Sequence, residues 1–233
     1  SKEYAKQRIE NASYENLKKK ANAEWEKALS RISVEGEEDR EDLFYSLLYR
    51  GLQSPYIVSE EDGTYPAIDG TIQKTEGTIY SGWAIWDNYR EQLPMLSIAY
   101  PDRYDDIVTS IENLYAFGKK NWATEHEPAP TVRTEHAMVV LLDAYNKGYE
   151  VDIKRIKDSL VKDAESLDYG APDKALESSY DNWAMAQLMK IDGDTVLYSK
   201  YLKKALDYKE YWNKDFKDIT RNDVDRMQAR GLY

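Results

Sequence analysis

The chain of 233 residues contains no cysteine and only two histidines. It can therefore form no disulfide, carries no thiolate nucleophile and has too few of the usual ligands for a zinc site. No apolar run approaches the roughly 20 residues needed to cross a bilayer, so no membrane span is predicted. Acidic residues outnumber basic ones by 43 to 32, whereas phosphate binding needs basic patches. Nucleic acids and membranes are therefore not expected as partners.

Several familiar catalytic signatures are also missing from the sequence. It has no glycine-rich phosphate loop, no nucleophile elbow and no HExxH zinc helix. The lack of cysteine fits an exported bacterial protein as well as a cytosolic one. We expect an exported protein, periplasmic or extracellular, whose signal peptide is not part of this chain.

Phenylalanine is scarce, with 3 residues, and the aromatic content is instead 20 tyrosines and 6 tryptophans. These side chains combine an apolar body with a polar tip, which suits wet clefts. Sugar rings can stack on them while sugar hydroxyls bond to polar groups nearby. A helical protein with tyrosine on its surface explains the same composition, and composition alone favours that simpler explanation.

The periodicity of apolar residues predicts an all-α fold with one long loop. Residues 1–35 are expected to form a connector helix, with Leu17, Trp25 and Leu29 on one stripe. A second helix over 37–52 would turn Leu43, Leu47 and Leu48 inward. Residues 53–80 are punctuated by glycine and proline and predict a long structured loop that contains a short hairpin. Long loops in compact domains are usually functional.

Further helices are predicted after this loop, and they alternate between apolar and charged. One over 85–99 should be interrupted by Pro94, since proline lacks the helical N–H. The others should span 104–119, 134–148, 153–167, 174–190 and 195–212, opened in part by Asp102, Asp152, Asp173 and Asp194. An inner and an outer ring of helices would show this alternation. About eight helices are predicted over the chain, whereas a closed (α/α)6 toroid of six helix hairpins needs twelve. If residues 36–233 form such a toroid, it is incomplete.

The first candidate site cluster lies where the loop enters a helix. It contains Trp83, Trp86, Asp87, Tyr89 and Arg90. A tryptophan can stack on a sugar, and a carboxylate makes strong hydrogen bonds to paired hydroxyls. The alternative places both tryptophans in the core, with Asp87 as a helix cap and Arg90 in an ion pair.

A second cluster pairs Glu177 with Asp181, which share one helix face at i and i+4. Close like charges require a cation, a proton or hydrogen-bond donors, unless the face is simply solvated. The third candidate is His136, at the start of an apolar helix, where a core or capping role is the more frequent one. His126, in a loop, could line a cleft. Trp86, His136 and Asp181 are spaced by about one helix hairpin each, so they could recur at one end of successive inner helices.

These motifs, in this order, resemble those of glycoside hydrolase family 92. Phe44-Tyr45-Ser46-Leu47-Leu48-Tyr49-Arg50 and the following Pro55 are similar to the family's FYxxLY…P signature. Glu61-Asp62-Gly63-Thr64-Tyr65 and Ile68-Asp69-Gly70 resemble its DxDGxY and DG pair. Trp86-Asp87-Asn88-Tyr89-Arg90 resembles WDTYR, and Leu176 to Trp183 resembles LEYAYDDW. The resemblance spans residues 40–233, with Asn88 in place of threonine and Ser178-Ser179 in place of Tyr-Ala.

The resemblance implies an (α/α)6 toroid and a calcium-dependent, inverting α-mannosidase, similar to α-1,2-mannosidases, that removes terminal α-mannose from glycans. It implies that Trp86 and Asp87 contact the sugar, and less directly Arg90, His136, Glu177 and Asp181. The family's general acid and general base, and most calcium ligands, have no matching position before Tyr233. We therefore expect no catalytic residue in this chain, no activity from it alone, and the remainder of the same polypeptide as its partner.

Two other classes fit the same residues. One is a non-enzymatic helical-repeat module that binds glycans through its tyrosines and tryptophans. The other is a different toroid enzyme, such as a lyase or a trehalase-like glycosidase. Substrate profiling with and without a chelator would separate these classes.

Overall fold

The computed structural model describes residues 6, 9, 12–122, 133–170 and 172–211. Within these residues the prediction of a mainly helical chain is confirmed, because helices dominate and the strands are few and short. No helix in this part is both long enough and apolar enough to span a bilayer. The loop histidine His126, predicted as a possible cleft residue, lies outside the described residues.

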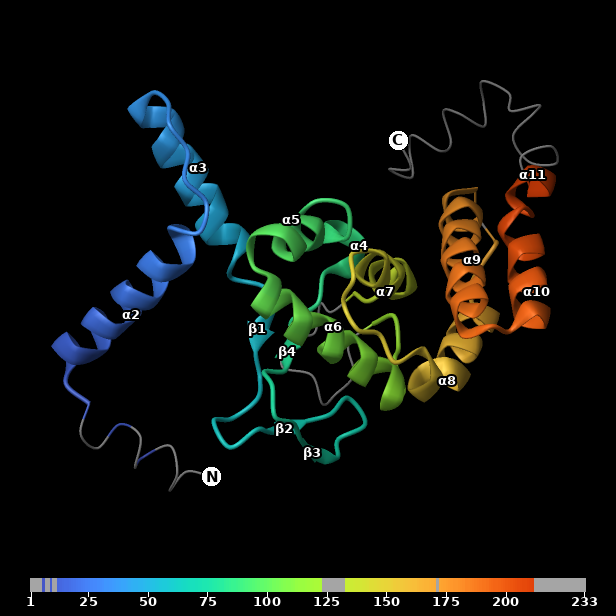
Figure 1. Cartoon of the computed structure of the whole chain (residues 1–233), viewed down its shortest axis with the longest axis horizontal. Helices are drawn as coiled ribbons and strands as arrows, with labels where there is room; N and C mark the ends of the chain where they lie inside the picture. Colours follow the sequence, from blue (N-terminus) through green and yellow to red (C-terminus); the bar gives the residue numbers. More distant parts are fainter. Residues whose placement is uncertain (1–5, 7–8, 10–11, 123–132, 171, 212–233) are drawn as a thin grey trace.

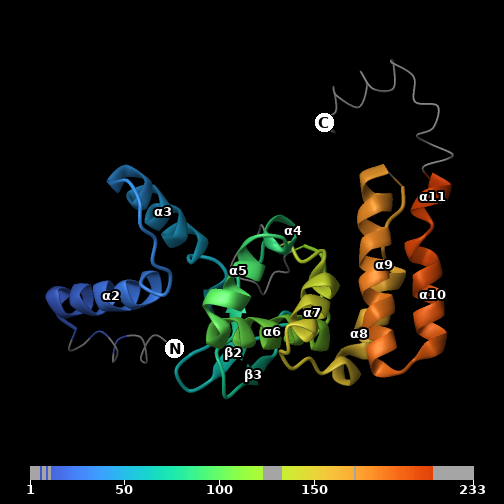
Figure 2. The same ribbon diagram turned by 45° about the horizontal axis from the view of Figure 1, so that its top comes forward.

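The helices α2 (Tyr14–Leu29) and α3 (Glu38–Gly51) project from one side of the body, as Figures 1 and 2 show. The hydroxyl of Ser13 caps α2 by accepting a hydrogen bond from the Asn16 N–H. No residue of α2 is buried, and in α3 only Leu48 is. The prediction that Leu43 and Leu47 point inward is wrong, since both are exposed. Trp25, Leu29 and Phe44 pack against the core while only partly buried, so these helices meet the body along one part of their apolar surface.

The long loop contains two small antiparallel strand pairs instead of one hairpin. Strand β1 (Tyr56–Ile57) pairs with β4 (Tyr80–Ser81), and β2 (Thr64–Pro66) pairs with β3 (Ile72–Lys74). The sequence Asp-Gly-Thr turns the chain twice, at Asp62 and again at Asp69. In both turns the aspartate Oδ1 accepts hydrogen bonds from the N–H and the hydroxyl of the threonine two residues later. Both Asp-Gly motifs therefore form turns in this structure.

The segment predicted as one helix over 85–99 is two, α4 (Ile85–Asn88) and α5 (Gln92–Ala99). The break precedes Pro94, which lies in the first turn of α5, where its missing N–H would have no helical partner. The next helix, α6 (Pro101–Ala116), begins earlier than predicted. Asp102 therefore lies inside its first turn and is not its cap.

Four longer helices and one short one complete the described fold: α7 (Ala137–Asn146), α8 (Ile153–Glu165), α9 (Pro172–Asp192), α10 (Thr195–Ala205) and α11 (Tyr208–Tyr211). Asp152 and Asp194 cap α8 and α10 as predicted, by accepting from the N–H groups of Arg155 and Leu197. Helices α9 and α10 lie side by side in both views, on the side of the body opposite α2 and α3 (Figures 1 and 2).

The main core forms around α5, α6, α7 and α9. The first six residues of α7 are all buried, as the apolar sequence of this helix predicts. Helix α6 is more buried than its charged sequence suggests, because one face of it carries an unbroken row that includes Tyr104, Ile107, Ile111 and Tyr115. Helix α9 contacts α7 and α8 as well as α10, so it forms the junction between the body and the final helix pair.

Candidate functional site

A cavity of about 370 Å³ opens at this junction. One wall comes from α4 and the start of α7, and the other from the first half of α9 and the loop before it. Four of the six residues predicted to bind substrate line it: Trp86, His136, Glu177 and Asp181. The other lining residues are Asn121, Trp122, Arg133, Glu135, Ser166, Leu167, Asp168, Asp173, Lys174 and Ser178. The structure therefore brings together residues that are about 90 positions apart in sequence.

Trp86 joins the two walls. Its indole Nε1–H donates a hydrogen bond of 2.9 Å to the Glu177 carboxylate, 91 residues further along the chain. The ring of Trp86 is half-buried, so part of its apolar face borders the cavity. This bond fixes the orientation of the ring and gives Glu177 a donor.

His136 and Asp181 form a pair at the base of the cavity. His136 Nδ1 lies 2.9 Å from Asp181 Oδ1, and the two side chains are 2% and 6% exposed. Burial raises the pKa of Asp181, and the neighbouring His136 opposes that shift. His136 has a left-handed backbone, with φ of 66°, which turns the chain into α7. The alternative of a capping histidine is not supported, because its side chain makes no cap hydrogen bond.

Glu177 and Asp181 do share one face of α9, as their spacing predicts. Each carboxylate has its own hydrogen-bond partner, Trp86 for Glu177 and His136 for Asp181. Separate partners relieve the repulsion that two close carboxylates would otherwise suffer. Asp181 lies in the middle of α9, not at the end of an inner helix as its spacing suggested.

Arg133 is the main residue of this cavity that sequence reasoning missed. Its guanidinium lies 4.4 Å from the centre of the Trp86 ring and 4.8 Å from that of Trp122. It also donates hydrogen bonds through Nε and Nη2 to Glu135, the closest of them 2.6 Å long. The Glu135 carboxylate raises the pKa of Arg133. No sequence motif marked Arg133, because its partners come from three separate segments.

Asp87 and Arg90 do not line this cavity. Asp87 is exposed, though its charge is near enough to help raise the pKa of Arg133. Arg90 is also exposed and lies 4.8 Å from the ring centre of its neighbour Tyr89, beside a smaller hollow of about 200 Å³. Their roles in binding stay predictions, with Asp87 the nearer of the two to the cavity.

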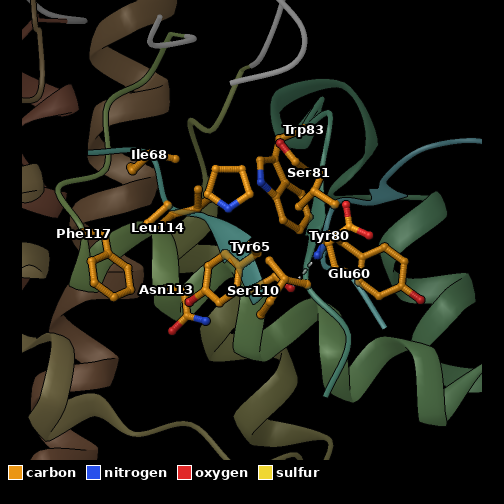
Figure 3. Close-up of a pocket in the computed structure, with 14 residues that line it drawn as sticks. Glu60, Tyr65, Ile68, Tyr80, Ser81, Trp83, Ser110, Asn113, Leu114 and Phe117 are labelled. Carbon is orange, nitrogen blue, oxygen red and sulfur yellow. Dashed lines mark hydrogen bonds between the residues drawn. The ribbon is translucent and has the colours of Figure 1, made fainter. Parts of the chain in front are cut away.

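A second cavity, of about 360 Å³, lies between the loop strands and α6 (Figure 3). Most of its lining is apolar and aromatic, including Tyr65, Tyr80, Trp83 and Phe117. Trp83 is 2% exposed and belongs to the core, as the structural alternative for this residue proposed. None of the six predicted binding residues lines this second cavity. The first cavity therefore remains the candidate site.

The described residues do not by themselves fit a calcium ion. Calcium takes six to eight oxygen ligands. In the part of the chain that the structure describes, no three histidine, aspartate or glutamate side chains are grouped so that they could hold a metal. Calcium therefore remains a prediction from the resemblance, and no chemical step is assigned to it here.

The sequence itself matches a family model. The model of the glycosyl hydrolase family 92 catalytic domain matches residues 1–231. The chain belongs to glycosyl hydrolase family 92. No curated protein matches it.

Solved structures of family 92 share the fold of this chain. The family 92 glycosyl hydrolase CcMan5 has a TM-score of 0.74 at 23% identity, over 86% of this chain and 29% of that one. The α-mannosidase BT3965 from Bacteroides thetaiotaomicron has a TM-score of 0.74 at 24% identity, over 87% and 31%. The inverting mannosidase BT2199 from Bacteroides thetaiotaomicron VPI-5482 has 0.72 at 23%, over 87% and 32%.

This likeness confirms the predicted fold class for the family 92 chain, as an incomplete toroid of helix hairpins. The chain spans less than a third of the length of each of these structures. The division into a connector and a toroid stays a prediction, and the family model covers both parts.

Proposed function

We propose that the protein to which this chain belongs is an inverting α-mannosidase that hydrolyses terminal α-mannose from glycans. The observation that carries the proposal is the meeting of Trp86, Glu177, His136 and Asp181 around one cavity in a family 92 chain. Its volume of about 370 Å³ lies within the range of small-molecule sites. Two of the similar structures are named as mannosidases, one of them inverting, which supports the substrate and the stereochemistry.

Each side of the cavity suits a different part of a sugar. The partly open Trp86 ring offers an apolar surface for the C–H face of a pyranose. Beside this ring the cavity is lined by the carboxylate of Glu177 and, almost fully buried, that of Asp181, and carboxylates are strong acceptors for sugar hydroxyls. An aromatic ring beside polar acceptors is the chemistry that a neutral carbohydrate requires.

We assign binding, not proton transfer, to the carboxylates of this chain. An inverting glycosidase needs one carboxylic acid and one carboxylate base, roughly 6.5–9.5 Å apart, on opposite sides of the scissile bond. Glu177 accepts from Trp86, Glu135 is held by Arg133, and Asp181 is buried against His136. Each of these carboxylates is already engaged in positioning a neighbour.

The test uses the complete gene product on α-linked mannose. We expect release of mannose from an α-mannoside, first detected by NMR as the β-anomer, and loss of this activity with a calcium chelator. Trp86→Ala should raise KM for the α-mannoside by at least about tenfold, because it removes both the ring and the donor to Glu177. Trp25→Ala is the matched control, since Trp25 packs on Tyr49 in the α2–α3 pair, away from the cavity.

Cleavage of a different glycoside, with none of α-mannosides, would overturn the substrate assignment. Retention of the anomer would overturn the inverting mechanism alone. We also propose that the protein is periplasmic or extracellular, because α-mannoside glycans are encountered as substrates outside the cytoplasm. Cell fractionation tests this location.

A further inference from the structure

Trp122 presents a large apolar surface at the edge of the candidate cavity. Its side chain lines the cavity, yet the residue is 61% exposed, more than any other described tryptophan. Exposed aromatic surface at the rim of a polar cavity marks a place where a ligand or partner binds. No residue motif used above assigns a role to it.

Trp122 is held firmly in spite of this exposure. Its backbone forms an antiparallel bridge with Arg133, and the guanidinium of Arg133 lies 4.8 Å from its ring centre. Next to it, the Asn121 carbonyl accepts from the Thr134 N–H, and the Asn121 side chain accepts from Lys119. A ring that is fixed before the ligand arrives loses little conformational entropy on binding.

Arg133 links Trp122 to Trp86. Its guanidinium lies over both rings, and its bonds to Glu135 limit its rotation. These contacts occupy much of the side chain, so Arg133 is better placed to position the two rings than to bind a sugar. The backbone of Arg133 also bonds to Trp83 and Ile85, which ties the α4 segment to the same point.

We infer that Trp122 forms a second sugar-binding position, beside the one at Trp86, and that Arg133 is the positioning residue that aligns the two rings. The inference rests on the proposed function, since it adds a neighbouring position to that site. The ligand class is a neutral oligosaccharide of two or more units. One sugar would stack at Trp86 and the adjoining sugar would stack on the exposed surface of Trp122.

The experiment compares the binding of α-mannobiose and of methyl α-mannoside to the 233-residue chain by ligand-observed NMR. Trp122→Ala should weaken α-mannobiose about threefold to tenfold and leave methyl α-mannoside within twofold, because only the disaccharide reaches the second ring. Trp122→Phe should restore most of the disaccharide affinity. Tyr14→Ala is the matched control, since Tyr14 is 72% exposed on α2 and does not line the cavity, and it should change neither.

Arg133→Lys tests the positioning role separately. It keeps the charge but loses the planar group that lies over both rings. We expect it to weaken the disaccharide as Trp122→Ala does, and the double variant to be no weaker than either single one. In the complete gene product, both variants should raise KM for α-mannobiose with little change in kcat.

Equal loss for both sugars in Trp122→Ala, or no loss for either, would overturn the second position. A wild-type chain that binds neither sugar would overturn it as well. Additive effects of the two substitutions would overturn the role of Arg133. If the complete gene product hydrolyses no α-mannoside while the binding difference persists, the proposed function fails and the second sugar position stands.

Discussion

At the scale of single residues, His136 and Asp181 are the pair in which we expect substitutions to be tolerated least. Both side chains are almost fully buried, and they are hydrogen-bonded to each other. A buried carboxylate is tolerated only with such a partner, because burial disfavours its charge. The left-handed backbone of His136 directs its ring toward α9. The pair therefore fixes the start of α7 against the middle of α9.

The pH dependence of stability tests whether burial or the attraction to His136 has the larger effect on the pKa of Asp181. Burial raises the pKa of Asp181 in the folded chain above its ordinary value, so the folded state binds the proton more tightly than the unfolded state. The contribution of Asp181 to stability is therefore greatest below the pKa of an unfolded aspartate, about 3.9, and is lost as the pH rises through the folded pKa. Asp181→Asn removes this slope, and its free energy of unfolding should gain on wild type between pH 3.5 and pH 7.

Urea unfolding of both proteins across this range measures the difference. Asp158→Asn is a suitable control, because Asp158 lies on α8 and is exposed. If wild type instead gains stability over Asp181→Asn as the pH rises, the attraction to His136 outweighs burial and the sign of the prediction is wrong.

The sequence predicted individual residues of this site, but it did not predict which of them contact one another. Trp86, His136, Glu177 and Asp181 were selected by residue type and by position on predicted elements, and all four line one cavity. The bond between Trp86 and Glu177 joins positions 91 residues apart, which periodicity cannot reveal. Arg133 escaped notice for the same reason, since it becomes significant only where three segments meet.

At the scale of helices and strands, two of the four predicted aspartate caps are found, and the predicted interruption of the 85–99 helix is confirmed. The side chains of Asp152 and Asp194 accept a hydrogen bond from the backbone N–H three residues later and so begin α8 and α10. This spacing can be seen in the sequence. The chain breaks between α4 and α5, a few residues before Pro94, and Pro94 itself lies in the first turn of α5, where proline is tolerated. The same residue type both ends and begins helices, and only the surrounding structure distinguishes the two cases.

A buried ion pair connects the segment just after α6 to α8, and its contribution to stability can be measured directly. Lys119 Nζ lies 2.9 Å from the Asp163 carboxylate, with side chains 3% and 11% exposed, and the Tyr115 hydroxyl donates to the same carboxylate. Lys119→Met leaves that buried charge without its cation. We expect a loss of about 3 kcal/mol in the free energy of unfolding.

Lys200→Met provides the matched control for this loss. Lys200 pairs with Glu165 at 2.9 Å, but the two side chains are 46% and 42% exposed, so the change should cost less than about 1 kcal/mol. Thermal unfolding followed by circular dichroism measures both variants. Similar losses in the two would contradict the role given to burial.

At the scale of the whole molecule, apolar side chains on α9 lack cover. Leu176, Tyr180 and Trp183 are 51%, 39% and 41% exposed, and they follow one another at helical spacing. The rings of Tyr180 and Trp183 stack 5.9 Å apart. The sequence predicted α9 as an inner helix. Tyr180 borders a hollow that Val139 and Val140 of α7 also line, yet the stripe of these three side chains of α9 keeps a large part of its surface exposed.

Self-association of the 233-residue chain through this stripe is the expected consequence. Exposed apolar surface associates because burial removes it from water, at about 25 cal/mol per Å². Leu176→Lys combined with Trp183→Lys should shift the molecular mass measured by light scattering toward that of a monomer at about 100 µM, a concentration at which we expect wild type to form larger species. Leu43→Lys with Leu47→Lys on α3 is the control, because those leucines are as exposed but lie on the opposite side of the body. A wild-type chain that stays monomeric at this concentration, or that responds only to the α3 pair, would show that the α9 stripe is not the associating surface.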